Sequence, residues 1–228
     1  PGERLPSERE LSERLAVSRP SLREAVAELQ QEGLLTTRAG SGIFVAEVLG
    51  SAFSPALIRL FARNDQAVFD YLAFRRDLEG MAAERAAKMG SDTDLKVIDA
   101  ILTRMEAAHG KRNPADEAAL YAQFHMAIVE ASHNIIMLHM MRAMFDLLSE
   151  GVFYNRQIMF RNRSTREALL DQHRAINAAI QARDGLAARA AVAVHMDFVE
   201  LALTELRKAE RHEALARLRL NHQSAKAP

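Results

Sequence analysis

The sequence predicts a mostly α-helical protein, in which a small N-terminal unit with a two-stranded β hairpin precedes a C-terminal all-α bundle. Glycine and proline are scarce, at 10 and 6 of 228 residues, and 49% of the residues are hydrophobic. Alanine, leucine, arginine and glutamate are abundant, a composition typical of helical proteins. From residue 56 onward the apolar residues recur with the period of a helix, whereas β-prone runs occur only near residues 34–46.

Charge and cysteine content exclude several classes of protein. The 30 basic and 30 acidic residues cancel, so no general positive field favours nucleic acid. The lack of cysteine excludes disulfides and thiolate metal sites, and it fits a cytoplasmic location. No apolar run reaches the roughly 18 residues of a membrane helix, and no signal peptide is visible. We therefore expect no membrane partner.

The stretch from Arg4 to Val26 reads as two short helices joined by a tight turn at Ala16–Val17. Ser7 followed three residues later by Glu10 predicts a capping box at the start of the first helix. Leu11 and Leu15 give that helix an apolar stripe, which we expect to face inward.

The second helix has its own start signals. Ser18 is expected to cap it, and Pro20 lies in its first turn, where a missing N–H removes no helical hydrogen bond. Glu32–Gly33 ends the pattern, with glycine as the usual stop. The apolar residues expected to face inward are Leu22, Val26 and Leu29.

The first turn of the second helix carries side chains suited to DNA. A helix in the major groove reads bases with its N-terminal residues, using arginine for guanine and serine for a base or a phosphate. Because residues 1–46 hold six arginines and seven acidic residues, these contacts must depend on local placement. The predicted DNA-contacting residues are Arg9, Ser18, Arg19, Ser21, Arg23, Arg38 and Gly40.

Two short β-prone runs, Leu34 to Arg38 and Ile43 to Ala46, flank the turn Ala39-Gly40-Ser41-Gly42. They predict a small hairpin, or wing, beside the two helices. Its glycines allow the backbone to approach a phosphate or the minor groove, and Arg38 adds a charge. An ordinary hairpin tip is the alternative interpretation.

The domain prediction places a DNA-binding unit at 1–46, a linker at 47–55, a helical domain at 56–210 and a polar tail at 211–228. The linker is small, polar and broken by Gly50 and Pro55. The charged stretch from Arg207 to Arg219 is read as a solvated helix end, with a second DNA contact as the alternative. Helices are expected at about 56–63, 66–89, 92–109, 114–132, 134–160, 164–182 and 184–210.

Three of the eight histidines lie in the middle of different predicted helices among apolar neighbours: His125, His173 and His195. Three imidazoles that converge inside a bundle can bind Zn²⁺ or a similar divalent ion and leave positions open for water or a ligand. The alternative for each is a core histidine with one hydrogen bond.

Arg75 is the next candidate, because an arginine on an inward helix face is expensive unless it meets an anion. A ligand carboxylate suits its guanidinium fork. A buried pair with Glu79, or with Asp77 or another acid, is the alternative. Asn134 is most simply the N-cap of the helix that follows it.

The motif LPSERELSERLAVSRPSLREAVAELQQEGLL, followed by RAGSGIFV, resembles the winged helix-turn-helix of GntR-type bacterial transcription regulators. The match covers about residues 2 to 46. The family has a further helix before this point, so the resemblance implies that the chain as given lacks that helix.

The helical region, about residues 65 to 205, resembles the FCD ligand-binding domain of the FadR-type branch of these regulators. The carrying residues are Arg75 and Glu79 in FRRDLEGMAAERAA, the segment FHMAIVEASHN, His173 in DQHRAI, and His195. The resemblance implies a metal held by three histidines, at positions 125, 173 and 195, and by an aspartate four residues before the first.

Tyr121 stands at the aspartate position, a departure from the family pattern. A neutral phenol is a poor ligand, so we expect a divalent metal, with zinc first, on the three histidines alone. The opposing interpretation is that the histidines bind the effector directly. The resemblance also implies that Arg75, Tyr121 and Asn134 lie at the effector pocket.

The run AQFHMAIVEASHNIIMLHMMRAMFDLLSEGVFYNRQIMF resembles the branch that contains the lactate, glycolate and pyruvate-dehydrogenase-complex regulators. This implies a homodimeric regulator of double-stranded operator DNA that responds to a small 2-hydroxy or 2-oxo monocarboxylate. A sugar acid such as gluconate or a uronate is the alternative effector.

Two further classes compete with this interpretation. A metal-dependent hydrolase could use three histidines and water, but the sequence shows no general base beside them, so an enzyme is not expected. The second competing class is a structural dimerisation module that carries a DNA-binding motif and has only a vestigial pocket.

Overall fold

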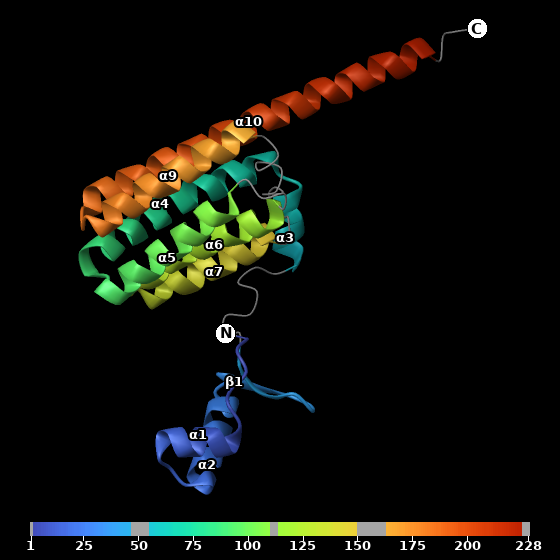
Figure 1. Ribbon diagram of the computed structural model, residues 1–228. Helices are drawn as coiled ribbons and strands as arrows, with labels where there is room; N and C mark the ends of the chain where they lie inside the picture. The colour runs from blue at the N-terminus through green and yellow to red at the C-terminus, as the bar shows by residue number, and fades with distance from the viewer. Residues whose placement is uncertain (1, 47–54, 110–113, 150–162, 225–228) are drawn as a thin grey trace. The chain divides into compact units, whose positions relative to one another are not determined.

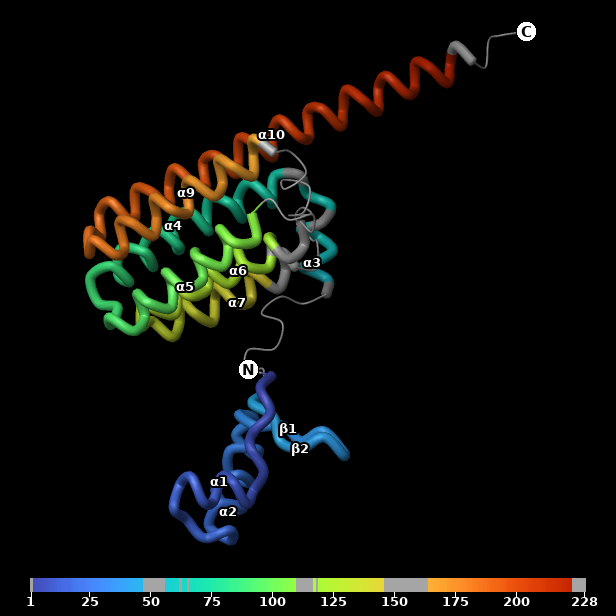
Figure 2. The backbone as a smooth tube through the Cα atoms, in the orientation of Figure 1, coloured from blue at the N-terminus to red at the C-terminus, as the bar shows by residue number. Residues whose placement is uncertain are grey.

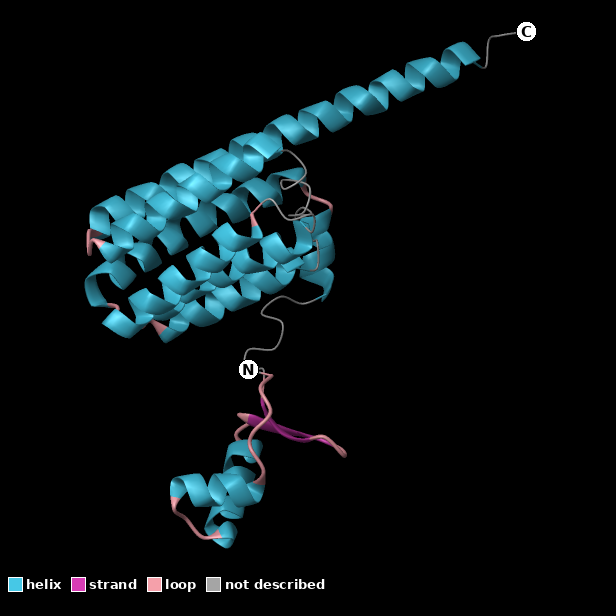
Figure 3. Ribbon diagram, in the orientation of Figure 1, coloured by secondary structure: helices cyan, strands magenta, loops and turns pink. Residues whose placement is uncertain are grey.

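The computed structural model describes residues 2–46, 55–109, 114–149 and 163–224 of the chain. The chain divides into an N-terminal unit, Pro1–Ala52, and a helical unit, Phe53–Pro228. The N-terminal unit contains α1 (Glu8–Leu15), α2 (Arg19–Gln31), β1 (Leu35–Arg38) and β2 (Gly42–Val45). Within the described ranges, strands occur in this unit alone (Figure 3). The mostly helical fold class is therefore as predicted.

Serine side chains begin both helices of the N-terminal unit. Ser18 Oγ accepts a hydrogen bond from the Ser21 N–H at 3.2 Å, which confirms the predicted cap of α2. Ser7 Oγ accepts from the Glu10 N–H at 3.3 Å. The predicted return contact from the Glu10 side chain to the start of the helix is wrong. The Glu10 carboxylate instead binds Arg14, one turn further along α1, at 2.6 Å.

The inward face predicted for these helices is only partly correct. Leu22 is 5% exposed, whereas Leu15 and Leu29 are 58% and 37% exposed. Leu15 is the last residue of α1, and Leu29 lies in the last turn of α2. Both stand near helix ends, which the other described elements of this small unit leave uncovered.

The wing forms as predicted, with β1 antiparallel to β2 and Leu35 opposite Val45. At its tip Gly40 and Gly42 have φ of +72° and +108°, which disfavour any side chain. The chain before α1 lies along the other edge of β2, where the Gly2 N–H donates to the Val45 carbonyl at 2.9 Å. A Cβ on Gly42 would lie 3.0 Å from Nε of Arg4, so a side chain there would also have to displace the arginine slightly.

The helical unit contains α3 (Pro55–Ala62), α4 (Asp65–Met89), α5 (Asp92–Ala108), α6 (Pro114–Ala131), α7 (Ile135–Ser149), α9 (Arg163–Gln181) and α10 (Gly185–Ser224). These helices lie close to the predicted ones (Figure 1). The second half of the helix predicted over 134–160 and nearly all of the predicted linker lie outside the described residues, although Pro55 begins α3.

The predicted end of the last helix near residue 210 is wrong, because α10 continues to Ser224. The stretch from residue 186 to 224 has neither glycine nor proline. Charge pairs at helical spacing, such as Arg217 with Glu213 at 2.8 Å, add local support. Figure 2 shows α10 running past the ends of the other helices of its unit.

Short polar signals set the helix boundaries that position the bundle. Ser91 and Asp94 form a complete capping box at the start of α5. Asn134 Oδ1 accepts from the N–H groups of Ile136 and Met137, each at 3.1 Å, which confirms it as the cap of α7. No described helix has the long apolar stretch needed to cross a membrane.

Helix α4 runs through the middle of the helical unit and contacts α3, α6, α9 and α10. Four small residues of α4, Ala82, Ala83, Ala86 and Ala87, are fully buried. A Cβ on Gly80 would lie 3.3 Å from the side chain of Arg189 on α10. The two helices therefore approach closely, and the packing tolerates little added volume.

We predict that Ala83→Leu lowers the free energy of unfolding by about 1–3 kcal/mol, because the larger side chain overpacks the interior. Urea unfolding followed by circular dichroism measures the change. Ala73→Leu, at an exposed position of the same helix, is the matched control. Equal stability of the two variants would contradict the close packing of α4.

Candidate functional site

The first turn of α2 presents the polar side chains that the sequence assigned to DNA. Ser18, Arg19 and Ser21 are all exposed. Arg23 is also exposed, but its Nε binds Glu8 Oε1 of α1 at 2.8 Å. Because this pair joins the two helices at the surface, a phosphate or a base must compete with Glu8 for Arg23.

The remaining predicted DNA contacts lie on α1 and on the wing. Arg9 is exposed on α1. The guanidinium of Arg38 lies over the ring of Phe44, 4.5 Å from its centroid, which holds the charge against the hairpin. Gly40 is at the tip between the strands. Serines, arginines and an open hairpin tip thus share one small unit.

In the helical unit, His125 of α6, His173 of α9 and His195 of α10 converge in the interior. They are 2%, 0% and 3% exposed, respectively. One ring nitrogen from each lies within 4.8 Å of the others. The helical period alone could not establish this convergence, because it depends on how three helices pack.

Each ring of this three-histidine cluster has a hydrogen-bond acceptor at Nδ1. His125 Nδ1 lies 2.5 Å from Glu79 Oε2, and His173 Nδ1 lies 2.6 Å from the Leu169 carbonyl. His195 Nδ1 lies 3.0 Å from Oε1 of Gln172. An acceptor at Nδ1 favours the ring form that carries its proton there, and in that form the lone pair of Nε2 can bind a metal.

Two of these ring nitrogens lie within hydrogen-bonding distance of each other, and either a shared proton or a metal ion satisfies that spacing. The Nε2 atoms of His125 and His173 are 3.1 Å apart. Ligand nitrogens about 2.0–2.1 Å from a tetrahedral zinc ion are separated by roughly 3.4 Å. The three-nitrogen donor set, the spacing of the His125–His173 pair and the outer acceptors at each ring therefore fit a divalent metal.

A buried ion pair lies beside the cluster. Arg75 Nε binds Glu79 Oε1 at 2.6 Å, and both side chains are 2% exposed. Burial acts to raise the pKa of Glu79, but the charges of Arg75 and His125 and their hydrogen bonds hold that pKa far below its usual range. Glu79 is thus ionised. The sequence analysis offered two roles for Arg75, binding an effector carboxylate or pairing with Glu79. The structure shows the pair with Glu79.

Tyr121 lies against the cluster, with its ring edge-on to His173 at a centroid distance of 4.4 Å. Burial raises the pKa of its phenol, and the nearby Glu117 carboxylate raises it further. Glu117 is itself buried and pairs with Arg166 at 2.7 Å and with His109 at 3.1 Å. Position 121 therefore contributes a neutral hydroxyl and no anionic ligand.

Sequence patterns did not single out Gln172 or the contact between Glu79 and His125. Gln172 directly precedes His173, but its bond to His195 depends on the packing of α9 on α10. Glu79 was read only as a partner of Arg75, one helical turn away. Asn134, the third predicted effector residue, is half-buried and uses its side-chain oxygen as a cap.

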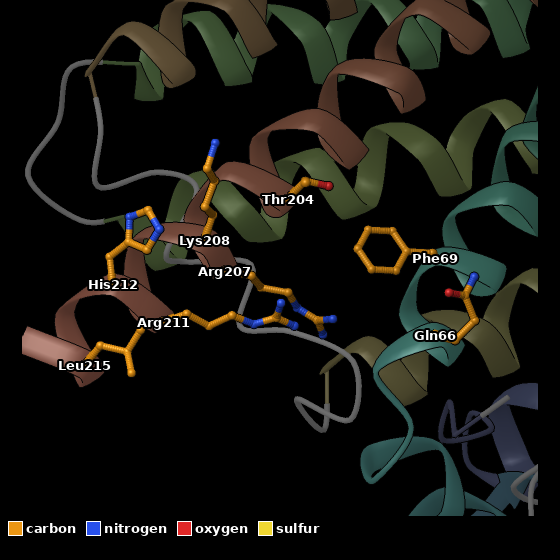
Figure 4. Close-up of a pocket in the computed structure, with 8 residues that line it drawn as sticks. All are labelled: Gln66, Phe69, Thr204, Arg207, Lys208, Arg211, His212 and Leu215. Carbon is orange, nitrogen blue, oxygen red and sulfur yellow. The ribbon is translucent and has the colours of Figure 1, made fainter. Parts of the chain in front are cut away.

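A separate hollow of about 630 Å³ lies between α4 and the outer part of α10. Positive side chains line it, and Figure 4 shows Arg207 and Arg211 pointing into the same space. The Arg207 guanidinium lies 5.4 Å from the ring centroid of Phe69. The hollow shares no residue with the three-histidine cluster, so the basic stretch of α10 forms a surface of its own.

Both units match known families. Residues 1–45 match the family described as bacterial regulatory proteins, gntR family, and residues 70–198 match the FCD domain. The chain is 34% identical to the putative L-lactate dehydrogenase operon regulatory protein of Escherichia coli K12, over 97% of this chain and 86% of that protein. It is 33% identical to the Glc operon transcriptional activator of the same organism, over 83% and 76%.

A solved structure supports the fold. The Streptococcus agalactiae GntR structure aligns with a TM-score of 0.53 and 26% identity, over 87% of this chain and 89% of that one. The two family matches together cover the helix-turn-helix, the wing and the bundle with its histidines. The chain therefore belongs to the GntR family, in the FadR-type branch that carries an FCD domain, and is a DNA-binding transcription regulator.

Proposed function

We propose that this regulator binds its operator as a homodimer and is controlled by a small 2-hydroxy or 2-oxo monocarboxylate. The ligand binds in the helical unit, at a divalent metal held by His125, His173 and His195. The convergence of three buried imidazoles, each with Nδ1 already bonded, is the observation that carries the proposal. Zinc is the first candidate because it accepts three nitrogen ligands and an open position.

The charge of the site favours an anionic ligand. Three imidazole ligands and the Tyr121 hydroxyl bring no negative charge to the coordination shell of a divalent ion. When bound, the metal supplies an acidic position for a carboxylate oxygen, and the neighbouring hydroxyl or keto oxygen of the ligand can join it. The ring of Tyr121 lies edge-on to His173 and borders this position.

Other observations support this class of effector. Two relatives are named for the L-lactate dehydrogenase operon and the Glc operon. Arg75 is paired with Glu79, so the cluster is the better position for the ligand carboxylate. A metal-dependent hydrolase is not favoured, because Glu79 binds His125 and Arg75 and the phenol of Tyr121 is a weak base.

Control of DNA binding requires only that the ligand binds one arrangement of the dimer more tightly than the other. The effector then shifts the population between a form that fits two half-sites and one that does not. Dimerisation matches the two-fold symmetry expected of an operator for a helix-turn-helix protein.

We predict that L-lactate, glycolate or pyruvate raises the thermal midpoint of the metal-loaded protein and that a chelator removes the effect. A ligand at 100 times its Kd adds about 2.7 kcal/mol to the stability of the state that binds it. A thermal-shift screen with and without chelator measures this. His173→Ala should abolish the shift and the bound metal, whereas His139→Ala, on α7 outside the cluster, should retain both.

Two results would contradict this proposal. A shift with gluconate or a uronate but none with the smaller acids would favour the sugar-acid alternative. Equal, near-zero metal in the wild type and in His173→Ala, in protein purified without a histidine tag, would remove the metal and favour direct recognition by the histidines.

We predict that Arg23→Ala weakens operator binding by about 1–3 kcal/mol if this side chain reads a base. Fluorescence anisotropy with an operator selected from a random duplex pool measures the affinity. Arg14→Ala is the matched control, because Arg14 is an exposed arginine of α1 that pairs with Glu10 in its own helix. Unchanged affinity in Arg23→Ala would contradict the placement of the reading helix.

The Glu8–Arg23 pair gives the same experiment a second arm. Glu8→Gln removes the acid that competes for Arg23 and should strengthen binding, most clearly at low salt. Weaker binding in Glu8→Gln would instead indicate that the pair orients Arg23 for DNA.

A further inference from the structure

The three histidines of the cluster differ in the group that accepts a hydrogen bond from Nδ1. His173 is held by a backbone carbonyl and His195 by an amide oxygen, whereas His125 is held by the ionised carboxylate of Glu79. We infer that Glu79, held in turn by Arg75, is a positioning residue that fixes His125 as a metal ligand and supplies the negative charge of the site. The inference rests on the proposed three-histidine metal site and extends it to residues behind the ligands.

The geometry divides the carboxylate between its two partners. Oε1 of Glu79 meets Arg75 Nε at 2.6 Å, and Oε2 meets His125 Nδ1 at 2.5 Å. Arg75 and Glu79 are one turn apart on α4, and His125 is on α6. The carboxylate therefore joins two helices, and its contact with Arg75 prevents it from rotating away from the imidazole.

Arg75, Glu79 and His125 are all buried, so each depends on the others for its hydrogen bonds. All three side chains are 2% exposed, so water does not replace a lost partner. The Arg75 guanidinium lies 4.9 Å from the ring centroid of Phe145 and 5.7 Å from that of Tyr71. These rings confine Arg75 from two sides. Without Arg75, Oε1 of Glu79 would lose the contact that fixes the direction of the carboxylate toward His125.

The charge of Glu79 bears on the departure at position 121. An aspartate at that position would place a negative charge directly on a metal, whereas the Tyr121 phenol, with its raised pKa, is neutral. A carboxylate that accepts the Nδ1 proton of a ligand imidazole makes Nε2 a stronger donor to a metal. Glu79 thus contributes charge through the ring of His125 and leaves the coordination position open for the effector.

Arg75 acts through Glu79 in this arrangement. Its role is to hold the carboxylate directed at His125, which differs from direct recognition of the effector. Replacing Arg75 should therefore weaken the metal before it alters ligand selectivity.

The test is zinc affinity of the full chain, measured by competition with a chromophoric chelator. Glu79→Gln keeps the shape and a hydrogen-bonding group but removes the charge, and we expect zinc to bind about 10–100-fold more weakly. Glu117→Gln is the matched control, because Glu117 is also a buried carboxylate paired with an arginine but contacts no histidine of the cluster. It should bind zinc as the wild type does.

Circular dichroism and thermal unfolding of both variants separate lost folding from lost affinity. Equal zinc affinity in Glu79→Gln and wild type would overturn the inference, as would an equal loss in the Glu117→Gln control.

If the wild type binds no zinc, the proposed metal site fails. A second measurement then tests separately whether Glu79 orients His125. Nitrogen-15 spectra of histidine-labelled protein report which ring nitrogen carries the proton. We expect the His125 proton on Nδ1 in the wild type and a changed His125 signal in Glu79→Gln, with His173 retaining its form. A wild-type His125 protonated on Nε2 alone would overturn the role of Glu79.

Discussion

Three imidazole rings buried between α6, α9 and α10 impose the main constraint on the helical unit. A polar group taken out of water must find a partner inside, and each of these rings has an acceptor at Nδ1. The acceptors come from α4 and α9, so four helices must keep their relative positions for the rings to be satisfied. The buried alanines of α4 and the approach of its Gly80 to Arg189 of α10 keep that framework tight.

The N-terminal unit follows a different logic, because its functional groups lie on the surface. With six arginines and seven acidic residues over 1–46, it has no positive excess to attract DNA at a distance. Its affinity for DNA must therefore come from the positions of its arginines. Arg23 pairs with Glu8, and the guanidinium of Arg38 lies over the ring of Phe44. Binding then exchanges one set of contacts for another, which favours selectivity over raw affinity.

The sequence was sufficient where local chemistry decides the structure. The caps at Ser18 and Asn134, the glycine-rich turn of the wing and the start of nearly every described helix follow from residues within a few positions of one another. It failed where distant packing decides. The exposure of Leu15 depends on what other elements cover, and the role of Glu79 depends on α4 meeting α6. The stretch from Arg207 to Arg219 is helical and largely exposed, as its reading as a solvated helix end implied. The end near residue 210 was placed too early, since nothing interrupts α10 before Ser224.

Helix α10 has a mechanical consequence that its composition alone does not suggest. His195 sits in its buried part, and Ser224 lies 29 residues further along the same uninterrupted helix, a length of roughly 43 Å at about 1.5 Å per residue. Lacking glycine and proline, this stretch has no hinge of its own. A tilt of about five degrees at the histidine would sweep the far end through about 4 Å. A small movement of α10 at the three-histidine cluster therefore becomes a larger displacement of its exposed C-terminal end.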